Sequence, residues 1–142
     1  MQPVYMQKDY LGKVNEKKFI KYLESKKEVE WWYKNGDFGS EFFAIPYKKQ
    51  GAEKMFYPDW IVKTKKGILI LETKKGDTAE SLDTKYKAEV LQEWIKKQKG
   101  KFFGGIVVED GGVWKICAKE KYNSDINSKD WEFLDNYFSR NK

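Results

Sequence analysis

The stretch FYPDWIVKTKKGILILETK, residues 56–74, decides the fold. Residues 56–64 and 68–74 are rich in β-branched and aromatic side chains, and they predict two strands joined by a tight turn at 65–67. In residues 68–71 both faces of the predicted strand are apolar. Such a strand is typical of the centre of a sheet that is covered on both sides.

The rest of the chain predicts helices and further strands around this pair. Apolar spacing and turn signals indicate a helix at about 16–27 capped by Asn15, strands at 29–33 and 42–47, a polar connection at 48–54, a helix at about 81–98, a strand pair at 102–108 and 113–118, and a helix at about 129–138. Residues 1–13 are expected to form a tail or an early strand. The order predicts one α/β domain over residues 1–142, a mixed sheet flanked by helices on both faces.

The composition narrows the chemistry. Histidine is absent, which excludes Ser-His and Cys-His catalysis and His-containing metal sites. Lys and Arg total 28 against 22 Asp and Glu, and this net charge of +6 favours a polyanionic partner, either nucleic acid or an anionic membrane surface. Cys117 is the only cysteine, so no intrachain disulfide can form. With no apolar run of about 18–20 residues and no signal-peptide pattern, we expect a cytoplasmic protein without a membrane partner.

Two acids and a lysine lie at the ends of the predicted strand pair. If the turn contains only residues 65 and 66, paired positions sum to 131, and Asp59 lies opposite Glu72. If Gly67 forms a bulge, the register moves by one residue. Lys74 shares a face with Glu72, whereas Thr73 points the other way. Two facing carboxylates repel each other unless a cation or a proton lies between them, which favours an oxygen-only site suited to Mg²⁺.

This pattern resembles a known superfamily. Pro58-Asp59, followed after twelve residues by Glu72-Thr73-Lys74, is similar to the motif of the PD-(D/E)XK nucleases. The motif alone is degenerate, but here the acid and the ExK triplet belong to two successive strands and a helix follows. The wider pattern of residues 43–47, 57–62 and 70–74 resembles the C-terminal endonuclease domain of type III restriction enzyme nuclease-helicase subunits, and residues 16–118 fit it.

The resemblance implies a restriction-endonuclease-like fold and a metal-dependent endodeoxyribonuclease, the cleavage domain of a restriction or defence system. Asp59, Glu72 and the backbone carbonyl of Thr73 would bind Mg²⁺, for which Mn²⁺ can substitute. Lys74 would orient or deprotonate the attacking water and stabilise charge in the transition state. The reaction would be hydrolysis of DNA phosphodiester bonds.

Two further residues have the positions of accessory groups in the superfamily. Glu16 precedes Phe19 by three residues and should share the buried side of the first helix. Lys87 precedes Val90 and Leu91 by three and four residues and should face the core in the same way. A plain helix-start acid and a lysine stem lying along a half-buried face remain the alternatives.

The chain lacks a G-x-x-x-x-G-K-[ST] phosphate loop. The resemblance therefore implies an attached or associated helicase/ATPase motor and a methyltransferase subunit as partners. Three other readings stay open. The acids could be a turn residue and a surface ion pair, the fold could be a non-catalytic module that binds nucleic acid or protein, or the enzyme could act on RNA or on branched or single-stranded DNA.

Overall fold

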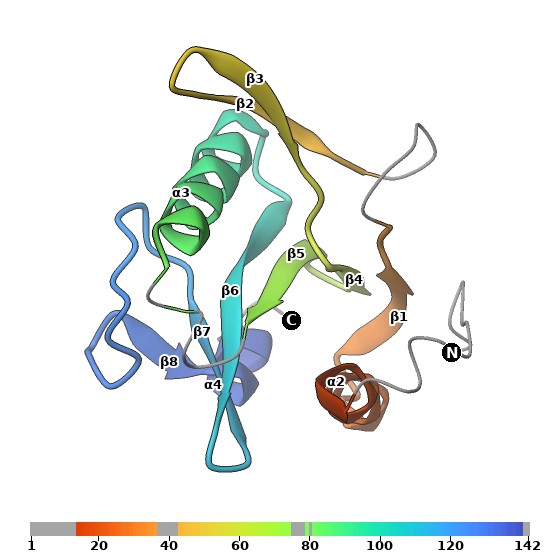
Figure 1. Ribbon diagram of the computed structural model, residues 1–142. Helices are drawn as coiled ribbons and strands as arrows, with labels where there is room; N and C mark the ends of the chain where they lie inside the picture. Colours follow the sequence, from red (N-terminus) through yellow and green to blue (C-terminus); the bar gives the residue numbers. More distant parts are fainter. Residues whose placement is uncertain (1–13, 37–42, 75–78, 80, 141–142) are drawn as a thin grey trace.

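The computed structural model describes residues 14–36, 43–74, 79 and 81–140 (Figure 1). Its elements are α2 (Val14–Ser25), β1 (Val29–Lys34), β2 (Ile45–Lys49), β3 (Ala52–Phe56), β4 (Trp60–Thr64), β5 (Gly67–Lys74), α3 (Leu82–Lys97), β6 (Phe102–Asp110), β7 (Val113–Cys117), β8 (Trp131–Phe133) and α4 (Leu134–Arg140). The expected tail or early strand at 1–13 lies outside the described residues.

The main sheet has the strand order β1-β4-β5-β6-β7-β8 in the described part of the chain. All its neighbours are antiparallel except β5 and β6, which are parallel. Helix α3 makes the crossover between those two strands, as a parallel pair requires. A mixed sheet with helices on both faces was predicted from the sequence, and the structure confirms it.

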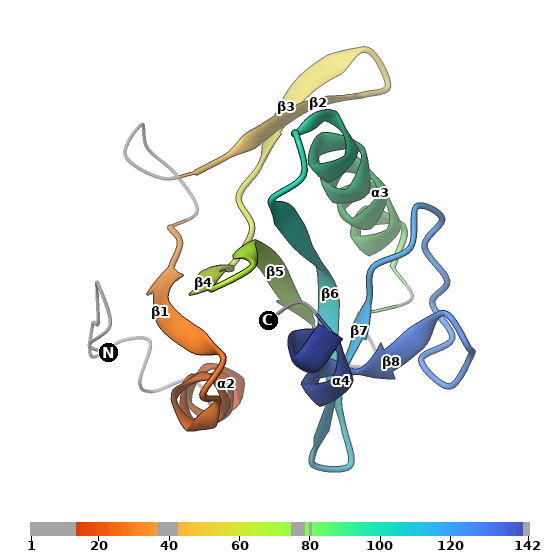
Figure 2. The ribbon, with the colours of Figure 1, turned by 180° about the vertical axis from the view of Figure 1, so that it is seen from behind.

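Helices α2 and α4 cover one face of the sheet, and α3 covers the other (Figures 1 and 2). On the first face, Phe19 of α2 and Phe138 of α4 pack with Trp60 and Leu71. On the second face, Leu91 of α3 packs with strand residues of the same sheet. Apolar side chains at helical spacing form both helix–sheet contacts, and their burial stabilises the layers.

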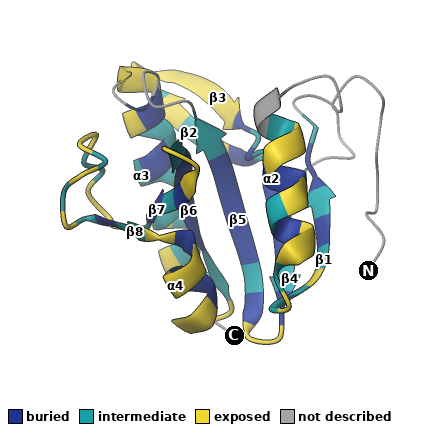
Figure 3. Ribbon diagram, turned by 90° about the horizontal axis from the view of Figure 1, so that it is seen from below, coloured by how far each residue is buried: buried dark blue, intermediate teal, exposed yellow. Residues whose placement is uncertain are grey.

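Strand β5 is the centre of the molecule. Figure 3 shows it buried along most of its length between the flanking helices. Leu69 and Leu71 point to α2 and α4, whereas Ile68 and Ile70 point to α3. The sequence predicted this central strand because its two faces are both apolar, and the prediction is confirmed.

The register of β4 and β5 is the one that a two-residue turn gives. Trp60 pairs with Leu71 and Thr64 with Gly67, so paired numbers sum to 131. The bulge at Gly67 is therefore absent. The glycine is needed for another reason: a Cβ there would lie 2.2 Å from the carbonyl oxygen of Lys101, next to the bond from the Ile68 N–H to that same oxygen.

Two segments differ from the prediction. Residues 48–54, expected as a connection, belong to the β2–β3 hairpin, whose two-residue turn places Gln50 at φ 53° and Gly51 at φ 81°. The single strand expected at 56–64 is instead divided by residues 57–59, where Pro58 has no N–H to donate.

The C-terminal helix expected at 129–138 is wrong in its first half. Residues 131–133 form β8, in which Trp131 pairs with Cys117, and the helix covers only Leu134–Arg140. Near the N-terminus, α2 begins at Val14, before the expected cap at Asn15, and ends at Ser25. None of the described helices is long and apolar enough to cross a membrane.

Candidate active centre

The three residues singled out from the sequence meet at one end of β4 and β5. Asp59 immediately precedes β4, and Glu72 and Lys74 lie at the C-terminal end of β5. The N–H of Asp59 donates to Oε1 of Glu72 at 3.0 Å. Nζ of Lys74 lies 3.1 Å from Oε2 of the same carboxylate. Each oxygen of the buried Glu72 side chain thus contacts one of the other two predicted residues.

The Asp59 carboxylate is anchored by Thr73. Its Oδ2 accepts hydrogen bonds from the Thr73 N–H at 3.1 Å and from the Thr73 hydroxyl at 3.0 Å. The same hydroxyl oxygen accepts from the indole N–H of Trp60 at 3.3 Å. Thr73 points away from Glu72, as predicted, and its hydroxyl connects the core tryptophan to the acid.

Lys34 is a member of the centre that the sequence analysis did not identify. Its Nζ lies 3.3 Å from Oδ1 of Asp59, and its side chain is only 10% exposed. The antiparallel pairing of β1 with β4 sets Lys34 opposite Trp60, and its ammonium lies 5.2 Å from the centroid of that ring. A signal was present: Lys34 shares a strand face with the buried Trp32, and a lysine on an apolar face needs a partner.

Asn35 fixes the backbone that carries Asp59. Its amide nitrogen donates to the carbonyls of Phe43 at 2.7 Å and Pro58 at 2.9 Å, and its main-chain N–H donates to the Asp59 carbonyl at 2.8 Å. The side chain is buried, so these bonds replace the water that a turn asparagine would otherwise bind. The sequence analysis did not identify Asn35.

Glu72 has the most perturbed electrostatics of the centre. Burial raises the pKa of its carboxyl to about 8, and the nearby charge of Asp59 acts in the same direction. Lys74 and Lys87 lower this pKa, but they do not offset the loss of water around a side chain that is 6% exposed. A cation bound at its oxygens would stabilise the ionised form of this carboxyl.

Lys87 of α3 interacts electrostatically with Glu72, and its accessory role stays a prediction. Burial lowers its pKa, but the hydrogen bond with Asp83 and the charge of Glu72 together raise it above the usual value. Its Nζ lies 3.2 Å from Oδ2 of Asp83 and 5.7 Å from the centroid of the Phe56 ring. Helix α3 thus brings a positive charge close to Glu72.

Glu16 lies in the first turn of α2 and is half-buried. Phe19, Ile20 and Leu23 of the same helix are buried against the sheet face that contains Trp60, which confirms the predicted buried side of this helix. A role for Glu16 at the acids stays a prediction.

The donor chemistry of the centre fits a hard divalent cation. Among the described residues, no group of three or more His, Cys, Asp and Glu side chains could hold a metal. Asp59 and Glu72 are only two such side chains, and the set of ligands that the resemblance predicts adds the backbone carbonyl of Thr73. Oxygen ligands with several remaining water positions are what Mg²⁺ prefers.

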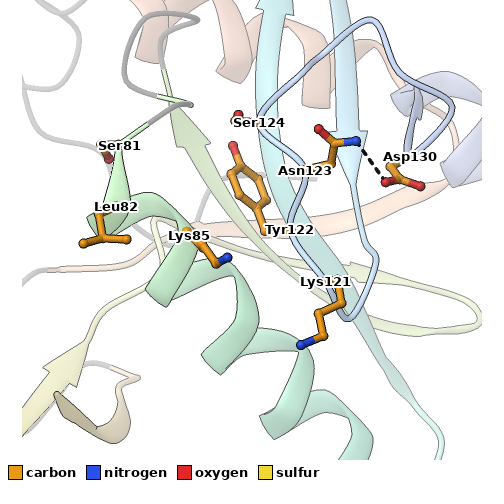
Figure 4. Close-up of a pocket in the computed structure, with 8 residues that line it drawn as sticks. All are labelled: Ser81, Leu82, Lys85, Lys121, Tyr122, Asn123, Ser124 and Asp130. Atoms are coloured by element: carbon orange, nitrogen blue, oxygen red, sulfur yellow. Dashed lines mark hydrogen bonds between the residues drawn. The ribbon is translucent and has the colours of Figure 1, made fainter. Parts of the chain in front are cut away.

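A separate hollow of about 480 Å³ lies between the start of α3 and the segment that precedes β8 (Figure 4). Ser81 caps the helix by accepting from the Thr84 N–H at 3.0 Å, and Asn123 donates to Asp130 at 3.2 Å. The lining residues are Ser81, Leu82, Lys85, Lys121, Tyr122, Asn123, Ser124 and Asp130. The hollow shares no lining residue with the acidic centre of Asp59, Glu72 and Lys74.

Comparison with known proteins places the chain in a family. Residues 6–131 match the YagJ family, and the protein belongs to it. No curated protein matches the sequence.

Proposed function

We propose that this protein is a Mg²⁺-dependent endonuclease that hydrolyses DNA phosphodiester bonds. The observation that carries the proposal is the Glu72 carboxylate, buried between the Asp59 N–H and the Lys74 ammonium at the end of a central strand. A strand end that holds two acids and a lysine sharing contacts is an arrangement for binding a cation and directing a water molecule.

Each residue then has a distinct task. Asp59 and Glu72 hold the ion, and Thr73 keeps the Asp59 carboxylate in place through its N–H and hydroxyl. Lys74 positions or deprotonates the attacking water and stabilises negative charge on the phosphate. The bound ion would supply charge neutralisation and a more acidic water molecule. Lys87 adds positive charge on the α3 side, where the substrate phosphate would approach.

The topology supports a restriction-endonuclease-like fold. Antiparallel strands β1, β4 and β5 are followed by helix α3 and by β6 parallel to β5, with the acids at the β4–β5 end. The net charge of +6 favours a nucleic-acid substrate. We propose that the domain cleaves DNA within a restriction or defence system, together with an attached or associated motor and a methyltransferase subunit.

A second candidate is a non-catalytic binding module on the same fold. One observation favours it: Lys34 contacts Asp59 and Lys74 contacts Glu72, so each acid has a lysine partner without an ion. A module of this kind would keep the four side chains as a structural cluster. It would have no need for a divalent cation.

A calorimetric titration with Mn²⁺ and Mg²⁺ distinguishes the two functions. We expect one binding site on the wild-type protein at millimolar or lower metal concentration, and loss of that site in Asp59→Ala. Glu93→Gln is the control, because Glu93 is an exposed acid paired with Lys97 on α3. Wild-type protein that binds neither metal, or an Asp59→Ala variant that binds as well as wild type, would favour the module.

A further inference from the structure

The β2–β3 hairpin has two faces of different charge. It forms a sheet of its own, and Figure 1 shows it beside α3, beyond the end of the main sheet. Alternation along the strands puts Lys49 and Lys54 on the inner face, the face that carries Ile45 and Phe56 into the core around α3. Lys48 lies on the outer face. The lysines of this short segment are therefore not equivalent.

On the outer face the charges are balanced. Lys48 pairs with Glu53 across the two strands, so a positive and a negative side chain lie side by side. On the inner face, Lys54 pairs with Tyr47 and Lys49 pairs with Ala52, so no acid of the hairpin opposes them. Lysines that served only to keep the hairpin solvated would not need to be separated into a charge-balanced outer face and a positive inner face.

The inner face leads to the acidic centre. Lys54 is two residues from Phe56 on the same side of β3, a separation of about 7 Å. The Phe56 ring lies below the ammonium of Lys87, which in turn interacts with the charge of Glu72. Phe56 therefore has two lysines beside it, Lys54 on its own strand and Lys87 on α3, and Lys87 interacts with the Glu72 carboxylate.

Lys49 extends this row toward the start of α3. Its Nζ lies 5.0 Å from the centroid of the Tyr86 ring and 4.0 Å from a carboxylate oxygen of Asp83. Asp83 also pairs with Lys87 of α3, so one carboxylate is shared by two of the three lysines in this row, Lys49 and Lys87. The inner face stays positive overall.

We propose that the inner face of the β2–β3 hairpin binds the phosphate backbone of a nucleic-acid duplex and guides it to Asp59 and Glu72. The inference rests on the proposed nuclease function, whose substrate form it specifies. A two-stranded β-ribbon with ammonium groups on one face matches the duplex backbone in charge and dimensions.

A duplex fits this surface better than a single strand does. Proteins that bind single strands stack bases on exposed aromatic rings. On the described hairpin, Phe56 is buried and Tyr47 is half-buried, and the exposed side chains include no aromatic ring. Recognition here therefore depends on ammonium–phosphate contacts, which position the duplex without reading its bases.

Adjacent lysines on opposite faces of the hairpin provide a matched test. Binding of the full chain to a fluorescent DNA duplex is measured by anisotropy in EDTA, so that no cleavage occurs. Lys54→Gln and Lys49→Gln should each weaken binding about threefold to tenfold and reduce the salt slope by about one, because each removes a phosphate contact. Lys48→Gln should stay within about twofold of wild type.

Three results would overturn the proposal. One is an equal loss from Lys48→Gln and Lys54→Gln, which would indicate only the effect of net charge. Another is unchanged binding in the Lys49→Gln, Lys54→Gln double variant. The third is a lysine-dependent preference for a single strand of the same sequence. Hairpin-dependent binding of the duplex by the wild-type chain, without metal-dependent cleavage, would refute the proposed function alone.

Discussion

The hydroxyl of Thr73 supports the acidic centre, and Thr73→Val removes it with little change in shape. The substitution eliminates the bond donated to the Asp59 carboxylate at 3.0 Å and the acceptor of the Trp60 indole N–H at 3.3 Å. A hydrogen bond to a charged acceptor contributes about 1.5–3 kcal/mol, and a buried donor left unsatisfied costs about 1–3 kcal/mol. Trp60 is fully buried, so water does not readily replace the lost acceptor. Allowing for the added methyl group, we expect a loss of about 2–4 kcal/mol in the free energy of unfolding.

Urea unfolding followed by tryptophan fluorescence measures this loss, with unchanged m-values as the sign of an unchanged unfolded state. Thr73→Ser is the matched control, because it keeps the hydroxyl and removes one half-buried methyl group. It should cost less than about 1 kcal/mol. If Thr73→Val destabilises the protein no more than Thr73→Ser does, the hydroxyl does not connect Trp60 to Asp59 in the way described.

Three other variants test the electrostatics and the backbone of the same region. The pKa of Glu72 is about 8 in the folded protein against 4.5 ordinarily, so its contribution to stability is full below about pH 4.5 and is lost as the pH rises to about 8. Without metal the loss is at most about 5 kcal/mol. Glu72→Gln should flatten this part of a plot of urea midpoint against pH, and equal slopes in both proteins would refute the assignment. Gly104→Ala would place a Cβ 1.9 Å from the Ile70 carbonyl oxygen at φ +139°, so it should lower the free energy of unfolding by at least about 3 kcal/mol. Gly112→Ala, with no atom within 4 Å of the new Cβ, should lower it by only about 1–2 kcal/mol through backbone strain. Similar losses for both variants in urea unfolding would contradict the close approach at Gly104. Tyr137→Phe removes the hydroxyl that accepts the Gly104 N–H at 2.9 Å, and a loss of about 1–3 kcal/mol is expected by the same method, with an unchanged midpoint as the contrary result.

The parts of the fold that follow from side-chain alternation were predictable. Residues 68–71 are apolar on both faces, and a central strand is the arrangement that buries them all. The same alternation left two registers open, and the structure has the one with a two-residue turn, which brings Asp59 to Glu72. Helical spacing placed Lys87 on the core-facing side of α3, where it interacts with the charge of Glu72.

The parts that depend on tertiary pairing were not predictable. Strand β3 exposes every residue except Phe56, so it has no apolar alternation, and the hairpin resembles a polar loop in sequence. Strand β8 has three residues and exists because Trp131 pairs with Cys117 of β7. Lys34 shares a strand face with the buried Trp32, which indicates that it needs a partner, but only the pairing of β1 with β4 places it against Asp59.

Cleavage of supercoiled plasmid in Mg²⁺ or Mn²⁺ tests the proposed endonuclease most directly, with wild type, Asp59→Ala and Lys74→Ala compared at equal concentration. We expect the wild-type protein to nick or linearise the plasmid only when metal is present, and both variants to be inactive while keeping the wild-type fold by circular dichroism. The protein variant Lys48→Gln, on the outer face of the hairpin, should cut the same plasmid at the wild-type rate. Metal-dependent cleavage that survives either substitution would contradict the assignment of Asp59, Glu72 and Lys74 as a catalytic centre.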